Sequence, residues 1–374
     1  MRDAELAAWL RLALTPGLGP VKSRALLARI GLPQRLFDGQ IGLTHATLAS
    51  LVGADCAQAL LDPPPQGLQA SLERTRNWLA AGPGRFVLSL ADPDYPSALL
   101  GLADAPLLLY GDGHRALLGQ PALAIVGSRN ASRQGEENAR AFAARLGSAG
   151  LCIVSGLARG IDAAAHAGAL EAGAGTIAVL GTGCDIVYPA GHRGLAARVQ
   201  RSGLLLSELP LGAGPMAQHF PRRNRIIAAL GCGVLVVEAA LQSGSLITAR
   251  IAAELGREVF AIPGSIHAPQ ARGCHRLIRD GAKLVESAQD IFEELRGQIP
   301  LPALATGPAA RDGAEPPDGV PRQVLAALGH DPSDVDTLAL RTRCDPGAVS
   351  AALLALELDG CVERLPGNRY QRLD

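Results

Sequence analysis

The chain has 374 residues, of which 48% are hydrophobic and 19% charged, with 35 basic and 35 acidic side chains. This length predicts two or three domains, and the balanced charge excludes an acidic disordered tail and a histone-like basic coat. No apolar run approaches the length of a membrane span and the N-terminus has no signal-like segment, so we expect a cytoplasmic protein without a membrane partner.

Seven cysteines, never two to four residues apart, argue against a disulfide framework and a cysteine-built zinc site. We expect neither a metal nor a cofactor.

Residues 1–80 predict a small helical domain. Apolar residues recur at three- and four-residue spacing in segments that we expect to be short helices: 5–13, 20–30, 46–61 and 68–80. The turn Gly17-Leu18-Gly19 between the first two resembles a helix-hairpin-helix element, whose amides can hold a nucleic-acid phosphate. We favour the alternative, an ordinary helical hairpin in a SAM-like bundle, over direct DNA contact.

Residues 81–297 alternate between strand-length apolar runs and helical stretches. The runs are rich in Val, Ile and Leu and lie at 122–126, 151–155, 176–180, 204–208, 234–237, 258–262 and 282–285. Helical stretches follow them, for example at 134–149, 161–172 and 245–255. This alternation predicts an α/β fold with a doubly wound, mainly parallel sheet. Ligands of such sheets bind outside the carboxyl ends of the strands, so the loops after the strands are where we expect function.

The last part of the chain predicts a linker and a small third domain. Residues 298–317 are rich in Pro, Ala and Gly without periodicity, which is typical of a linker. Residues 318–374 predict three short helices at 324–328, 334–341 and 346–358, followed by a hairpin of 362–365 and 370–373. Three helices and a hairpin in this order are the pattern of a winged helix.

Three of the loops that follow predicted strands place small residues at the start of a helix, and two of them add an arginine. Glycine permits close backbone approach, hydroxyls and free amides there bind anions, and arginine pairs with phosphate through two N–H groups. The candidate residues are Ser128 and Arg129 after the first strand; Ser155, Gly156, Arg159 and Gly160 after the second; and Ser243, Gly244, Ser245 and Thr248 after the fifth. Asp162, in the first turn of the next helix, fits a structural cap better than a catalytic acid.

Two further loops add aromatic rings and a dense set of arginines. Tyr188 and Arg193 follow the third strand, and Phe220, Arg222, Arg223, Asn224 and Arg225 follow the fourth. Rings stack on bases and arginines hold phosphates, so this composition suits a polyanion that carries bases. The alternatives are that the rings anchor their loops and that the arginines form a solvated basic turn.

The charge distribution favours the middle domain as the nucleic-acid site. Residues 121–297 carry 18 basic and 14 acidic side chains, a net charge of +4, whereas residues 318–374 carry 6 and 9, a net charge of −3. Nonspecific affinity for nucleic acid is largely electrostatic. The predicted third helix of the last domain has no basic residue, so we do not expect that domain to bind DNA. The exceptions to this expectation are Arg364, Arg369 and Arg372 on the predicted hairpin.

Five motifs occur in the order and spacing of the DNA-processing protein A (DprA or Smf) family, which the chain resembles over residues 86–295. They are Val126-Gly127-Ser128-Arg129, Ser155-Gly156-Leu157-Ala158-Arg159-Gly160-Ile161-Asp162, Tyr188-Pro189, Phe220-Pro221-Arg222-Arg223-Asn224-Arg225 and Ser243-Gly244-Ser245-Leu246-Ile247-Thr248. The resemblance implies an extended Rossmann-like core, a homodimer, binding of incoming single-stranded DNA in natural transformation, and loading of the RecA recombinase. It also implies that Arg129 is the principal phosphate ligand, with Arg193 the nearest match for a basic contact beyond Tyr188-Pro189.

Two other functions compete with this interpretation. Glu238, ahead of Ser243-Gly244-Ser245, resembles the acid of nucleoside-monophosphate phosphoribohydrolases, although the basic groups here are spread over at least four loops rather than one compact pocket. The sheet can also be a dimeric interaction scaffold without DNA binding. The sequence has no H-E-x-x-H, G-x-S-x-G, G-x-G-x-x-G or P-loop motif, and we therefore expect that it is not an enzyme.

Overall fold

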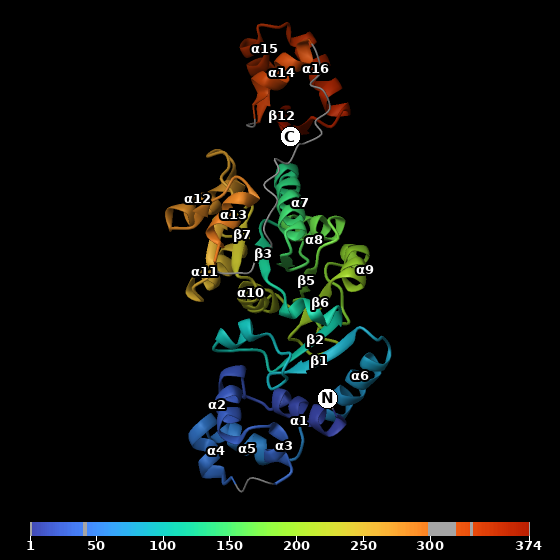
Figure 1. The fold of residues 1–374 in the computed structure, drawn as a ribbon, viewed down its shortest axis with the longest axis vertical. Helices are drawn as coiled ribbons and strands as arrows, with labels where there is room; N and C mark the ends of the chain where they lie inside the picture. Colours follow the sequence, from blue (N-terminus) through green and yellow to red (C-terminus); the bar gives the residue numbers. More distant parts are fainter. Residues whose placement is uncertain (1, 40–42, 298–318, 330–331, 374) are drawn as a thin grey trace. The chain divides into compact units, whose positions relative to one another are not determined.

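The computed structural model describes residues 2–39, 43–297, 319–329 and 332–373 (Figure 1). Contacts divide the chain into two compact units, Met1–Pro302 and Ala303–Asp374, each of which is described by itself. The predicted linker at 298–317 lies outside the described residues.

The first unit is built on a mostly parallel sheet, as the sequence predicts. Among the described residues, nine strands run in the order β1-β2-β6-β5-β4-β3-β7-β8-β9. Their bounds are β1 Arg85–Ser89, β2 Leu108–Gly113, β3 Ala122–Val126, β4 Cys152–Ser155, β5 Thr176–Val179, β6 Leu204–Ser207, β7 Gly233–Val236, β8 Glu258–Ala261 and β9 Lys283–Leu284. All seven predicted strands are present, and β1 and β2 were not predicted. Both pair antiparallel, β1 with β2 and β2 with β6, at one edge of the sheet.

The strand order puts the point at which the chain reverses direction across the sheet between β3 and β7. The chain proceeds outward from β3 through β4 and β5 to β6, then crosses back to β7 on the other side of β3. The helices of this part are α7 Arg133–Ser148, α8 Ile161–Glu171, α9 Arg193–Ser202, α10 His219–Leu230, α11 Ser245–Glu254, α12 Arg272–Arg279 and α13 Ala288–Glu294. A reversal of strand order of this kind separates the loops after the two central strands and leaves room for a ligand.

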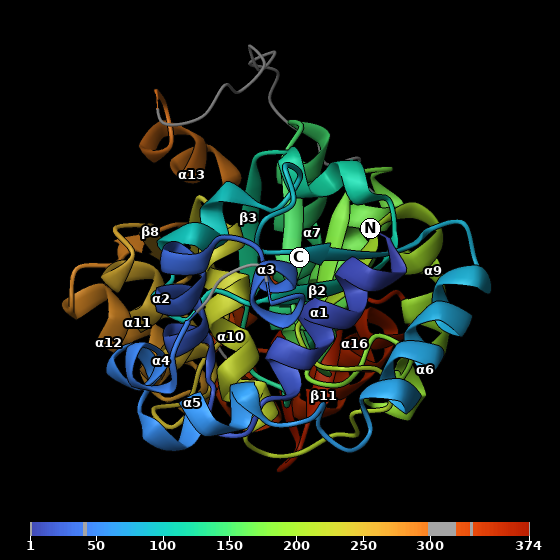
Figure 2. The ribbon, with the colours of Figure 1, turned by 90° about the horizontal axis from the view of Figure 1, so that it is seen from below.

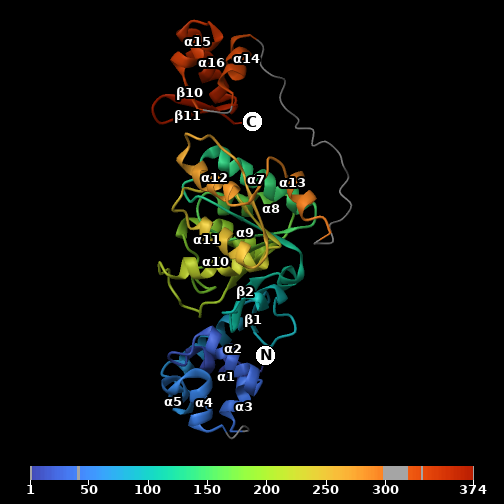
Figure 3. The ribbon, with the colours of Figure 1, turned by 90° about the vertical axis from the view of Figure 1, so that its left-hand side faces the viewer.

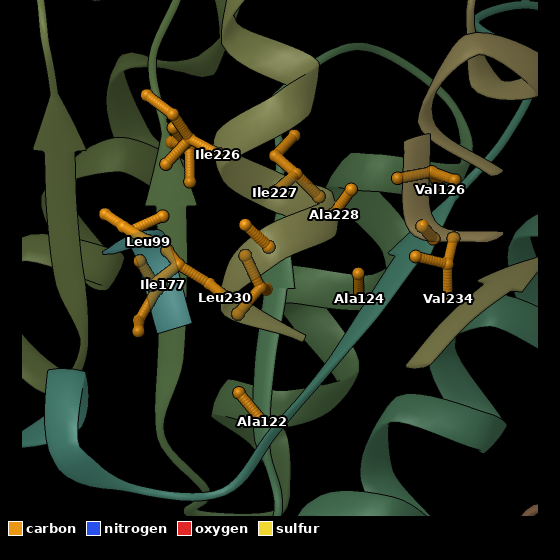
Figure 4. Close-up of a cluster of buried hydrophobic side chains, with 14 of the residues drawn as sticks. Leu99, Ala122, Ala124, Val126, Ile177, Ile226, Ile227, Ala228, Leu230 and Val234 are labelled. Carbon is orange, nitrogen blue, oxygen red and sulfur yellow. The ribbon is translucent and has the colours of Figure 1, made fainter. Parts of the chain in front are cut away.

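The crossing helix α10 is seated on the sheet by its apolar face. Ile226, Ile227 and Leu230 share one buried cluster with Ala124 and Val234 of the central strands (Figure 4). The spacing of these three α10 residues puts them on one side of a helix. This packing fixes the start of α10 at the carboxyl edge of the sheet.

The helical front packs on the sheet and shares its core. Its helices are α1 Asp3–Leu14, α2 Pro20–Ile30, α3 Pro33–Phe37, α4 His45–Val52, α5 Ala54–Leu61 and α6 Leu68–Ala80 (Figure 2). Only the short α3 was not predicted. Trp78 of α6 contacts Tyr110 of β2 edge to face, with ring centroids 6.2 Å apart, and Leu205 of β6 belongs to the same buried cluster. The boundary expected near residue 80 therefore lies inside one compact unit, because residues on both sides bury a common core.

The second unit is a winged helix, as predicted. It contains α14 Val320–Leu328, α15 Val335–Thr342 and α16 Pro346–Leu358, with β10 Ser333–Asp334, β11 Val362–Leu365 and β12 Arg369–Arg372 (Figure 3). The strand order is β10-β12-β11, with both pairs antiparallel. Val349, Leu353 and Leu356 of α16 form the buried core together with Leu325 and Leu338.

The sequence analysis expected neither a disulfide framework nor a membrane span. The seven cysteines all fall within the described residues and none forms a disulfide; Cys56, Cys152, Cys184 and Cys274 are buried. Within the same part of the chain, every helix is too short or too polar to cross a lipid bilayer.

Candidate nucleic-acid interface

The loops after β3, β4 and β7 meet at the carboxyl edge of the sheet. The Ser128 amide donates a hydrogen bond to the Glu238 carbonyl at 2.8 Å, and the Ile161 amide donates to the Ser128 carbonyl at 3.2 Å. Gly160 has a φ of 72°, and a Cβ at this position would lie 2.4 Å from the Ser128 carbonyl oxygen. Only glycine fits this left-handed, crowded position without a shift. The structure thus brings together three motifs that are far apart in the sequence.

A buried carboxylate shapes the loop after β4. Asp162 accepts hydrogen bonds from the amides of Gly156 at 3.1 Å and Ala158 at 3.4 Å. Burial raises the pKa of the Asp162 carboxyl, and the nearby charge of Arg223 acts in the opposite direction. Asp162 is therefore a structural residue, which agrees with the sequence interpretation.

Arg223 lies beneath this loop rather than on the surface. Its side chain is buried, and Nη1 donates a hydrogen bond to the carbonyl of Val179 at the end of β5. Gly156 is needed above it, because a Cβ there would collide with the guanidinium. Burial lowers the pKa of Arg223 to about 10, so the group stays charged at neutral pH. The prediction that Arg223 is a DNA ligand does not fit this geometry; the side chain supports the loops instead.

Arg225 is also committed to protein groups. Its guanidinium pairs with the buried carboxylate of Glu208, and Nε lies 3.1 Å from Asp104 Oδ2. Burial raises the pKa of Glu208, while Arg225 and Arg222 lower it. We correct the expectation that Arg225 binds phosphate, because a buried charge that is paired with two carboxylates is not available to a strand in solvent.

An exposed stack of three side chains joins three loops. The rings of Tyr188 and Phe220 have centroids 5.5 Å apart and are tilted by 44°, and the Arg129 guanidinium carbon lies 5.4 Å from the centre of the Phe220 ring. Tyr188 is 46% exposed and Phe220 is half-buried against Gly181. Phe220 is thus a loop anchor that still offers part of its ring, and Tyr188 offers a face to solvent. The sequence had left these two roles open.

Four of the six arginines predicted for the site are exposed, and each comes from a different loop. They are Arg129 after β3, Arg159 after β4, Arg193 at the start of α9 and Arg222 in the first turn of α10. Arg222 contacts Glu208 at 3.2 Å, yet nearly half of its side chain remains accessible. These arginines lie on the segments that follow β3, β4, β5 and β6, and Arg129 alone contacts the ring stack directly. Basic side chains spread over four neighbouring segments fit an extended anion.

The serine and threonine hydroxyls that were predicted to bind an anion divide into exposed and buried groups. Ser155 is fully buried and donates to the Ile125 carbonyl at 2.6 Å, and Ser245 and Thr248 are buried as well. Ser128 and Ser243 keep partial exposure. Direct contact with a ligand through the hydroxyls of the three buried residues is therefore not supported, although the sequence interpretation had included them.

Asn224 ties the start of α10 to the loop before α11. Its side-chain amide donates to the Gly244 carbonyl at 3.2 Å, and the hydroxyls of Ser243 and Ser245 are 2.7 Å apart. Gly244 is exposed and precedes the first turn of α11. Asn224 therefore positions the loop before α11, and the backbone at Gly244 is the part of this loop that faces solvent.

Glu238 is occupied by the neighbouring helix. Its carboxylate accepts hydrogen bonds from the amide of Ser132 at 3.0 Å and from the Ser132 hydroxyl at 2.5 Å, and Ser132 is the N-cap of α7. Burial raises the pKa of this carboxyl. The acid on which the phosphoribohydrolase interpretation depends is thus part of a helix cap. Within the described residues, no group of three or more His, Cys, Asp or Glu side chains is placed to hold a metal ion.

His192 is a site residue that the sequence analysis did not identify. Its Nδ1 lies 2.9 Å from the carbonyl oxygen of Leu157, a buried residue with a φ of 57°. This contact joins the loop after β4 to the loop after β5, immediately before Arg193. A lone histidine four residues after Tyr188 carried no recognisable signal, because its partner is a backbone carbonyl 35 positions away in the sequence.

Comparisons with known proteins find related sequences and structures. The family model described as DNA recombination-mediator protein A matches residues 86–296, and that of the DprA winged helix domain matches residues 308–368. Protein Smf of Synechocystis is 36% identical to this chain over the full length of both. The X-ray structure of DNA processing protein A (DprA) from Streptococcus pneumoniae is similar with a TM-score of 0.66 and 38% identity, over 79% of this chain and 98% of that one. A structure of DNA processing protein A from Helicobacter pylori, described for its single-stranded DNA binding mode, is similar with a TM-score of 0.52 and 29% identity, over 57% of this chain and 96% of that one.

Proposed function

Because the chain belongs to the DNA-processing protein A (DprA, Smf) family, we propose that it binds single-stranded DNA along the carboxyl edge of the sheet in its first unit. The observation that carries this proposal is the stack of Arg129, Phe220 and Tyr188 among exposed arginines. Aromatic faces bind unpaired bases, which a duplex hides, and each stacked base contributes on the order of 1–3 kcal/mol. The H. pylori relative, described as a single-stranded DNA binder, points to the same ligand.

In this proposal the protein holds the single DNA strand mainly through its sugar-phosphate backbone. Arg129, Arg159, Arg193 and Arg222 bind phosphates, and the hydroxyl of Ser128 and the amide ends of the loops add hydrogen-bond donors. Nothing in this set reads the edge of a base, so we expect little sequence preference. The supporting contacts of Asp162 and Arg223 order the loops before the strand arrives, which reduces the entropy lost on binding.

We further propose that the protein acts as a homodimer that loads the RecA recombinase on the bound strand in natural transformation. A protein that holds phosphates and stacks only some bases leaves the pairing edges of the strand free, and a recombinase needs those edges for homology search. In this proposal the protein has no catalytic step of its own and needs no cofactor. The engagement of Glu238 by Ser132 supports binding rather than hydrolysis.

Titration of a fluorescent oligonucleotide tests the proposal. Oligo(dT) and a mixed sequence of the same length are expected to bind with similar affinity, and the affinity is expected to fall steeply between low and moderate salt. RecA-dependent ATP hydrolysis on strands coated with single-strand-binding protein is expected to rise when the protein is added. Release of ribose 5-phosphate from AMP, with no oligonucleotide binding, would instead support the phosphoribohydrolase.

A further inference from the structure

The third helix of the winged-helix unit, α16 (Pro346–Leu358), is apolar on two opposite sides. One side, with Val349, Leu353 and Leu356, is buried in the unit's own core. The opposite side exposes Leu354, which is 58% accessible, and Leu358, which is 81% accessible. A helix that is hydrophobic all round is normally covered on all sides, whereas none of the residues that the structure describes covers Leu354 and Leu358 fully.

The exposed face forms a continuous stripe. Ala351, Leu354, Ala355 and Leu358 are all exposed, and their spacing of three and four residues places them in one row along the helix. Small and large residues alternate in the row, a pattern that lets the side chains of a second helix interdigitate. We call these four residues the α16 stripe.

The charged residues of α16 and of the positions directly before and after it are all acidic. Glu357 is the one charged residue of α16, and Asp345 and Asp359 stand immediately before and after it. All three are exposed, and the Asp345 carboxylate also caps the helix by accepting from the amide of Gly347 at 2.8 Å. Residues 318–374 together carry 6 basic and 9 acidic side chains.

These acidic charges determine which kind of partner can cover the α16 stripe. A DNA backbone or an anionic lipid surface would be repelled by the acidic rim. A second copy of α16 laid antiparallel on the first would bring Asp345 of one copy next to Glu357 and Asp359 of the other, which is unfavourable for like charges. A protein helix with an apolar face and flanking Lys or Arg matches both the stripe and its rim.

We propose that the α16 stripe is a docking site for a basic amphipathic helix of a partner protein. The partner's apolar side chains cover Leu354 and Leu358, and its basic side chains lie beside the acidic groups at the edges. In a winged helix the third helix usually enters the major groove with basic and amide side chains. Here that position is used for a protein instead.

The test uses the full-length chain and two synthetic 18-residue peptides that differ only in charge. Both carry the same leucine face; one has lysine at the flanking positions and the other has glutamate. Fluorescence anisotropy is expected to show that the lysine peptide binds at least tenfold more tightly than the glutamate peptide. The double variant Leu354→Gln/Leu358→Gln is expected to bind the lysine peptide at least tenfold more weakly. The matched control Leu32→Gln/Leu61→Gln, which changes two exposed leucines of the first unit, is expected to bind it like the parent chain.

Three results would overturn the proposal. The first is equal affinity for the two peptides, or no binding of either. The second is unchanged binding by the α16 double variant while its circular dichroism and melting temperature match those of the parent, because the peptide would then occupy another surface. The third is self-association of the parent chain that the α16 substitutions abolish, because the stripe would then belong to a second copy. The comparison of the two peptides needs no variant, so the test holds even if the substitutions disturb the fold.

Discussion

Helix α10 of the first unit and helix α16 of the second unit have surfaces that differ in kind. The first seven residues of α10 include Phe220 and three arginines, whereas α16 has no basic residue and three acidic neighbours along or beside it. We therefore expect that the winged-helix unit does not bind DNA, although this fold often does. The side chains on the presented surface decide it.

A second contrast lies within α10. Arg222 faces solvent, while Arg223 and Arg225 are buried and hold the loops in place. Arginines one or three positions apart in a single motif therefore perform two tasks, and substitutions can separate them.

The largest expected effect is on stability. Arg225→Ala removes the buried one of the two arginines that pair with Glu208, and breaking a buried ion pair from one side costs about 3–5 kcal/mol. Urea denaturation of the first unit is expected to show this loss. Arg222→Ala, at the exposed end of the same pair, is expected to leave the unfolding midpoint nearly unchanged; an equal loss in both variants would contradict the distinction.

The pH dependence of the Arg225→Ala variant has a defined sign. Burial raises the pKa of Glu208 in the folded protein, and loss of Arg225 removes an opposing effect. An acid with a raised folded pKa costs no stability below its unfolded pKa and costs most above its folded pKa. The difference in unfolding free energy between parent and variant is therefore expected to be larger at pH 7.5 than near pH 4.5. A difference that grows as the pH falls would rule out Glu208 as the cause.

Arg129→Ala is expected to weaken single-stranded DNA binding by about 1–3 kcal/mol, the scale of a charge-assisted hydrogen bond. The fold is expected to remain intact, because the side chain is exposed. The matched control is Arg145→Ala, which removes the same charge in the last turn of α7, at the opposite edge of the sheet. If both variants lost affinity equally, the effect would be net charge rather than a site.

Phe220→Leu separates stacking from charge. We expect an affinity loss of about 1–2 kcal/mol, in the lower part of the range for one base, because Tyr188 remains. The slope of log affinity against log salt is expected to stay the same, whereas Arg222→Ala is expected to reduce it by about 0.7, the value for one phosphate contact on a single strand. A reduced slope in Phe220→Leu would show that the ring acts only by placing Arg129.

Removal of the winged-helix unit is expected to have the smallest effect on DNA. A chain that ends at Gly297 retains every exposed arginine and both rings of the site, so its affinity for single strands is expected to stay within tenfold, or about 1.4 kcal/mol, of the full chain. A larger loss in a folded truncation would mean that the acidic unit binds DNA through its hairpin arginines.

Much of the architecture could be predicted from local patterns. Buried parallel strands are continuous runs of Val, Ile and Leu, which is why β3 to β9 were found from residues such as 122–126 and 234–237. The antiparallel β1 and β2 were missed because their runs contain Gly, Asp and Arg and because only a short 3-10 helix, Ser97–Gly101, lies between them. The shared core of the helical front and the sheet depends on the contact of Trp78 with Tyr110, which no short-range pattern reports.

The site was predicted at the level of loops but not of single side chains. A motif gives the order of Arg222, Arg223 and Arg225 without saying which side of the helix is buried. One signal was present: Arg223 stands three and four positions before Ile226 and Ile227, on the side that faces the core. The partners of Arg225, by contrast, are Glu208 and Asp104 from distant loops, and only the folded chain brings them together.

The central claim, that the carboxyl edge of the sheet holds a single strand, is tested most directly by competition. A labelled 20-nucleotide strand bound to the full-length protein is displaced with unlabelled single strand or blunt duplex of the same length, at two salt concentrations. We expect single strand to compete at least tenfold better than duplex, because paired bases cannot stack on Tyr188 and Phe220. We also expect the affinity to fall as salt rises, because the arginines bind phosphates. Equal or better competition by duplex, or an affinity that does not change with salt, would contradict it.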